Sequence, residues 1–82
     1  MPYLNEHAAR VRQPGRFQKE TIRSKQIAKG LRIIIGKLKP RGASMVTQAY
    51  RFRKVVWTPA QARKWLREHQ IQFITFDPAR KE

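Results

Sequence analysis

The sequence predicts an α+β fold: a small antiparallel sheet of β-β-α-β order with one packed helix, preceded by a mostly extended basic N-terminal arm. Three observations predict this fold, namely β-branched residues at 31–35, alternation of polar and apolar residues from 44 to 53, and helix-start signals at Thr58. A chain of 82 residues has room for one domain. We divide it into an arm with a short helix at 1–30, a compact α+β body at 31–78 and a tail at 79–82.

The arm is predicted to contain one short helix and irregular chain. An asparagine suited to N-capping starts a helix over 5–12, and Pro14 must end it within two turns. Residues 16–30 show neither strand alternation nor a helical stripe, so we predict an irregular segment that anchors Phe17 on the body and turns at Gly30.

Two strands and a turn begin the body. The β-branched run at 31–35 lies between two glycines, which favours a strand. Residues 39–42 are typical of a turn, because their proline presets φ and their glycine accepts a positive φ. Alternation from 44 to 53 predicts a half-buried strand that directs Phe52 to the core and Arg51 outward.

One helix and a third strand complete the body. Thr58 is an N-cap, a proline occupies the first helical position, and Gln61 stands where it completes a capping box. The apolar stripe that follows at helical spacing consists of Ala62, Trp65, Leu66 and His69. Residues 71–76 predict a third strand, which Asp77 and Pro78 end.

The distribution of charge is the main functional signal. The formal net charge is +14, and between Glu20 and Glu68 there are thirteen Lys and Arg and no acid. Such a charge repels itself in a compact monomer, so we expect a negatively charged partner. Nucleic acid, DNA or RNA, is the simplest such partner, and an acidic protein or nucleoprotein complex fits the same charge.

Composition excludes several other classes of protein. The chain has no cysteine, which excludes disulfides, zinc-thiolate sites and thiol catalysis, and we expect no cofactor and no metal. Its longest apolar run is far shorter than the ~20 residues that cross a bilayer, and residues 1–6 do not resemble a secretory signal. We therefore expect a soluble intracellular protein without membrane association. His7 and His69 each adjoin a glutamate, but neighbouring side chains diverge, so we expect no enzyme.

Basic side chains of four segments are the candidate phosphate-binding residues, although each group also fits an ordinary solvated surface. They are Arg32, Arg51, Arg53 and Lys54 on the exposed sheet face, Lys37, Lys39 and Arg41 at the turn, Arg63, Lys64 and Arg67 on the outer helix face, and Arg10, Arg12, Arg16 and Lys19 on the arm. Aromatic residues fall mainly on core-facing positions, which favours packing over base stacking.

Several short motifs resemble a small module of tailed bacteriophages and prophages. They are residues 7–12, Pro14, Phe17, 36–38, 48–52, Trp57–Thr58, Ala62–Arg63 and His69. That module occurs alone or attached to virion-assembly proteins such as prohead proteases. The resemblance implies a phage protein, located in the cytoplasm of an infected bacterium or in the virion. The chain departs from the module near Gln13 and Lys19, where neutral or basic residues replace acids.

These observations favour a non-enzymatic, phage-encoded nucleic-acid-binding module that acts mainly through phosphate contacts. One alternative is a virion or capsid-assembly component that docks on an acidic protein surface. Another is an inhibitor of a host defence nuclease, similar in role to anti-CRISPR proteins. The sequence leaves open DNA against RNA, single against double strands, and the oligomeric state.

Overall fold

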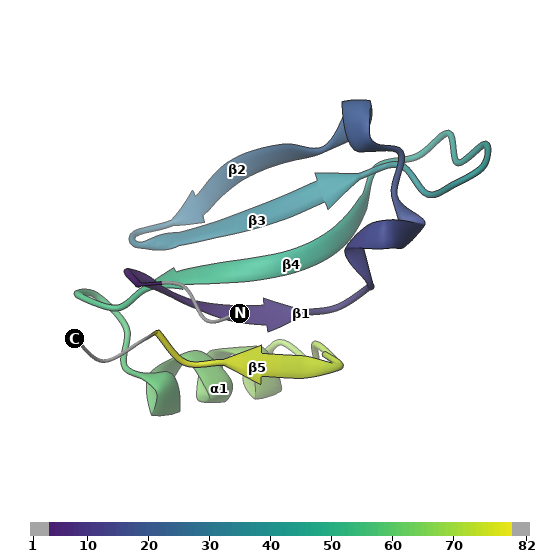
Figure 1. Cartoon of the computed structure of the whole chain (residues 1–82). Helices are drawn as coiled ribbons and strands as arrows, with labels where there is room; N and C mark the ends of the chain where they lie inside the picture. The colour runs from purple at the N-terminus through teal and green to yellow at the C-terminus, as the bar shows by residue number, and fades with distance from the viewer. Residues whose placement is uncertain (1–3, 80–82) are drawn as a thin grey trace.

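The computed structural model describes residues 4–79. Over this range the chain forms a five-stranded antiparallel sheet, one α-helix and two short 3-10 helices, which confirms the predicted α+β class. The elements are β1 (Glu6–Arg10), η1 (Pro14–Arg16), η2 (Lys19–Thr21), β2 (Arg23–Ala28), β3 (Leu31–Gly36), β4 (Val46–Arg53), α1 (Pro59–Glu68) and β5 (Thr75–Asp77). The strands follow one another in space as β2-β3-β4-β1-β5 (Figure 1).

Strand β1 replaces the helix predicted over 5–12, so that prediction is wrong. It lies between β4 and β5 and pairs with both, with Ala9 opposite Tyr50 on one side and Phe76 on the other. Ala9 is fully buried there. Alanine favours helices locally, but the preference is weak, and tertiary packing and hydrogen bonding to two strands outweigh it.

Strand β2 occupies much of the segment predicted to be irregular. It is an edge strand that pairs with β3 alone, and all six of its side chains are exposed. Their exposure explains why no apolar alternation marks the strand. The predicted turn at Gly30 is confirmed, with a φ of 67°. Residues 6–28 therefore contribute two strands to the sheet instead of forming a separate arm.

Strands β3 and β4 confirm the two predicted strands, except that β4 begins at Val46 instead of residue 44, and they define the two sides of the sheet. Their register places Leu31 opposite Phe52 on the side covered by α1, and Arg32 opposite Arg51 on the other side. We call these the helix side and the open side. The core on the helix side consists of Ala9, Leu31, Phe52, Ala62 and Leu66, with Tyr50, Trp57, Trp65, Ile71 and Phe76 packed around it.

Helix α1 begins with the predicted capping box. The Gln61 amide donates to the Thr58 hydroxyl at 3.1 Å, and the Thr58 amide donates to the Gln61 side chain at 2.9 Å. The strand predicted over 71–76 after the helix is observed as β5, which is shorter and comprises Thr75–Asp77. Residues 71–74 instead carry the chain from the helix end back to β1. Of the predicted tail, only residue 79 lies within the described residues.

Candidate nucleic-acid interface

Two of the predicted basic groups meet at one end of the sheet. The connection between β1 and β2, which includes η1 and η2, lies against the loop that joins β3 to β4 (Figure 1). The Lys39 amide donates to the Arg16 carbonyl at 2.7 Å, and the Gln18 amide donates to the Lys37 carbonyl at 2.8 Å. Arm and turn therefore form one surface.

Side chains reinforce this junction. The Gln18 side-chain amide donates to the carbonyls of Leu38 at 2.8 Å and Gly42 at 3.2 Å. The Lys37 amide donates to the Thr21 hydroxyl at 2.8 Å. Phe17 is 1 % exposed, which confirms its predicted role as an anchor. The loop is thus held by the segment that precedes it by about twenty residues in the chain.

We define the basic end as the cations that this junction gathers: Arg16, Lys19, Arg23, Lys37, Lys39 and Arg41. Lys37 is half-buried and the other five are exposed. Glu20 is the one acid between residues 11 and 53. Hydrogen bonds hold together the backbone segments that carry these cations, so less backbone entropy is lost when the cations bind a polyanion together.

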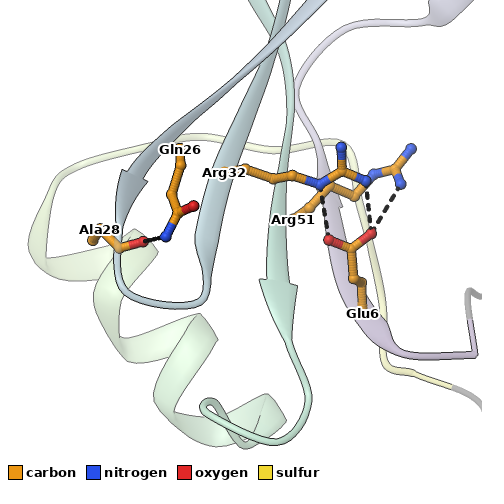
Figure 2. Close-up of polar contacts among 5 residues, drawn as sticks. All are labelled: Glu6, Gln26, Ala28, Arg32 and Arg51. Atoms are coloured by element: carbon orange, nitrogen blue, oxygen red, sulfur yellow. Dashed lines mark hydrogen bonds and ion pairs between the residues drawn. The ribbon is translucent and has the colours of Figure 1, made fainter.

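The open side of the sheet carries the predicted strip of arginines, but an acid interrupts it. The Glu6 carboxylate accepts two hydrogen bonds of 2.9 Å from the Arg32 guanidinium and one of 3.4 Å from Arg51 (Figure 2). The hydrogen bond from Arg32 is the main cause that lowers the pKa of Glu6, and the charges of both arginines add to it against the opposing effect of burial. A phosphate at this strip must compete with that carboxylate.

The sequence reasoning missed this ion cluster because it placed Glu6 in the first turn of a short helix, away from the arginines of the sheet. In the sheet, Glu6 stands opposite Arg53, the exposed third arginine of the strip. A groove of about 590 Å³ runs beside the cluster, lined in part by Glu6, Arg32 and Arg53. Lys54 follows Arg53, and its amide donates to the Asn5 carbonyl at 3.0 Å.

The remaining predicted site residues are not counted in the basic end, and they do not form a single group of their own. Arg10 faces the open side of β1 opposite Ala49, and Arg12 donates to the Thr47 carbonyl at 2.7 Å. On α1, the Arg63 guanidinium lies 4.6 Å from the centre of the Phe76 ring, a cation–π distance. Lys64 and Arg67 are exposed on the same helix.

Three basic residues escaped sequence reasoning because β2 was not predicted. Arg23 and Lys25 stand opposite Ile35 and Ile33, on the helix side of the sheet, and Lys29 lies in the turn after the strand. All three are exposed. The period-two order of Arg23, Ser24, Lys25 and Gln26 was the available signal for a strand with a basic face.

The two histidines have structural partners. The His7 ring accepts a hydrogen bond from the Ala79 amide at 2.7 Å and contacts the Trp57 carbonyl at 2.8 Å through its other nitrogen. Its neighbour Glu6 points to the opposite side of β1, as expected for adjacent residues of a strand. His69 stacks on Trp65 with ring centres 4.0 Å apart, at the end of α1.

No helix within residues 4–79 is both long and apolar enough to cross a membrane. Comparisons of the chain with protein-family models, with curated proteins and with solved structures found no match.

Proposed function

We propose that this protein is a non-enzymatic nucleic-acid-binding module that contacts phosphates through its basic end. The observation that carries the proposal is the hydrogen-bonded junction of the β1–β2 connection with the β3–β4 loop, which groups six cations. Lys and Arg on loops bind phosphate oxygens without reading bases, so little sequence specificity is expected. From the resemblance to phage modules, we further propose that the protein acts in an infected bacterium or in the virion.

The first test is the salt dependence of binding. Fluorescence anisotropy measures the affinity of the nuclease-treated protein for labelled single-stranded DNA, duplex DNA and RNA at several salt concentrations. With about six phosphate contacts, the affinity falls on the order of a thousandfold between ~50 and ~200 mM salt, because counterions are released. An affinity that is independent of salt rules the proposal out.

Two variants of equal charge locate the interface. Lys39→Gln with Arg41→Gln removes two exposed cations from the basic end, and Arg53→Gln with Arg67→Gln removes two exposed cations outside it. The first variant is expected to lower the log–log salt slope by about 0.7 to 0.9 per lost contact, whereas the second leaves it nearly unchanged. Equal losses in both variants would mean that net charge, and not the basic end, determines binding.

A protein partner is the second candidate, and exposed apolar side chains at the opposite end of the sheet favour it. Val55 is 81 % exposed, Leu4 48 % and Ile27 44 %. They lie near the β2–β3 turn, where Val56 packs against Gly30, and cations such as Lys29 and Lys54 border them. Such a patch suits a virion component that docks on an acidic surface. Stoichiometric copurification with phage particles tests this candidate, and absence from purified particles opposes it.

A further inference from the structure

A groove between the β2–β3 turn and α1 contains both tryptophans of the chain. It has a volume of about 510 Å³, and Trp57 and Trp65 line it together with Ala28 and Val56. The two indoles are half-buried, so they pack on the core and still contribute to the groove wall. Since the chain has two tryptophans in total, its tryptophan fluorescence reports on this groove alone.

The tryptophans are fixed in place by their neighbours. The Trp57 indole N–H donates to the Lys29 carbonyl at 3.0 Å, which ties the β2–β3 turn to the start of α1. The Trp57 and Trp65 rings meet edge to face, with centres 6.5 Å apart at 82°. Trp65 stacks on His69 with its rings at 26°. An incoming planar group therefore meets a preformed aromatic wall, with little ordering cost.

Two cations stand at this groove, one from each of its sides. Lys29 comes from the β2–β3 turn and Lys64 from α1, and both are exposed. Glu68 also lines the groove, one helical turn after Lys64, so the local charge is +1. The groove thus offers an aromatic surface together with ammonium groups, which matches a ligand that carries a flat ring and an anionic group.

A row of cations connects the groove to the basic end. Lys25 and Arg23 project from the helix side of β2, in line after Lys29, and Arg23 itself belongs to the basic end. α1 packs on β3, β4 and β1 through Leu31, Phe52 and Ala9, which leaves this face of β2 exposed. The six residues of β2 span about 20 Å at ~3.3 Å per residue.

We propose that the ligand is a single-stranded nucleic acid, one base of which enters the tryptophan groove while its backbone follows β2 to the basic end. This inference rests on the proposed function and specifies its substrate class. Aromatic side chains bind unpaired bases of any sequence by stacking, whereas the bases of a duplex are already stacked and paired. Duplex DNA therefore reaches the basic end but leaves the groove empty.

The closing experiment compares tryptophan fluorescence and anisotropy in one titration. A labelled oligothymidylate and a duplex of the same length are added to the full chain. We expect the single strand to quench the tryptophan fluorescence as it binds, and the duplex to bind without quenching. Binding of the single strand without quenching overturns the inference and leaves the proposed function intact. Equal quenching by the duplex also overturns it, and absence of binding in either signal overturns both.

Variants separate the groove from the basic end. Lys29→Gln with Lys64→Gln keeps both tryptophans and removes the groove cations, and it is expected to weaken single-strand binding about tenfold, the cost of one displaced base. Its duplex affinity should change no more than that of the Arg53→Gln, Arg67→Gln control, which removes the same charge. Equal loss for single strand and duplex overturns the inference. So does stronger quenching by a tryptophan-free acidic peptide, which would identify a protein ligand.

Discussion

At the scale of single residues, Glu6 partly neutralises the arginine strip on the open side of the sheet. Its carboxylate joins Arg32, 26 residues away in the chain, and Arg51, 45 residues away. Side chains of Glu6 and Arg51 are less than a fifth exposed, so the interaction is screened less than a surface ion pair. The same carboxylate that stabilises the sheet reduces the positive potential of its open side, which supports the basic end as the proposed phosphate site.

The Glu6 ion pairs predict a pH-dependent stability. Because the folded-state pKa of Glu6 lies below its ordinary value of 4.5, the ionised carboxylate stabilises the fold above pH 4.5, and this contribution is lost as the pH falls through the folded-state pKa. Glu6→Gln is expected to lower the free energy of unfolding by on the order of 1 kcal/mol at neutral pH, and by less in acid.

Urea denaturation at neutral pH and below pH 4.5 measures that difference, with Glu20→Gln, an exposed residue of η2, as the control of equal charge change. The control substitution should change the free energy of unfolding very little at either pH. A constant deficit of Glu6→Gln across the pH range would show that packing of the side chain, and not its charge, stabilises the sheet.

At the scale of elements, the sequence predicted those helices and strands whose formation is determined by residues close together in the chain. Helix α1 was predicted because its capping box lies within four residues. β3 and β4 were predicted because apolar composition and alternation mark them. β1 was predicted as a helix because only partners on β4 and β5, far along the chain, make residues 6–10 a strand. The contact of Arg16 with Lys39 likewise joins distant parts of the chain and has no local signal, whereas β2 has one local signal, its alternation of basic and neutral residues.

The residue Gln70, just after the end of α1, has a backbone conformation that favours glycine. Gln70 has a φ of 55°, in the left-handed region, while the amides of Gln70 and Ile71 donate to the carbonyls of Arg67 at 3.1 Å and Leu66 at 2.9 Å. This hydrogen-bond pattern is the Schellman motif, in which glycine is preferred at the left-handed position. Gln70→Gly is expected to stabilise the protein by about 0.5–1 kcal/mol, because it removes most of the cost of the positive φ.

Thermal denaturation of the Gln70→Gly variant measures the gain. Gln72→Gly is the matched control, since its position is exposed and its φ is not positive. The control should be neutral or destabilising, because glycine increases the entropy of the unfolded chain. If both variants lower the melting temperature, the left-handed conformation at Gln70 contributes no measurable strain.

At the scale of the whole molecule, the charge is distributed unevenly. Cations of the basic end occupy the end of the sheet formed by the β1–β2 connection and the β3–β4 loop, and the exposed apolar side chains of Leu4, Ile27, Val55 and Val56 lie at the opposite end. A net charge of +14 on 82 residues opposes the compact state through self-repulsion. The stability of the free protein is therefore expected to rise with ionic strength, whereas the proposed binding to nucleic acid is expected to weaken.

Because salt has opposite effects on the stability of the free protein and on the proposed binding, we predict a salt-dependent effect of the ligand on thermal stability. As salt rises from ~0.01 M to ~0.15 M, the Debye length falls from about 30 Å to about 8 Å, so the melting temperature of the free protein should rise. A bound oligonucleotide at about 100 times its dissociation constant adds about 2.7 kcal/mol at low salt, and this addition disappears as salt weakens binding. Melting curves with and without oligonucleotide should therefore be far apart at low salt and converge at high salt. The two melting curves should lie closer together for the Lys39→Gln, Arg41→Gln variant than for the Arg53→Gln, Arg67→Gln variant, which has the same net charge. A free protein whose melting temperature falls with salt would mean that ion pairs such as Glu6–Arg32 outweigh the repulsion.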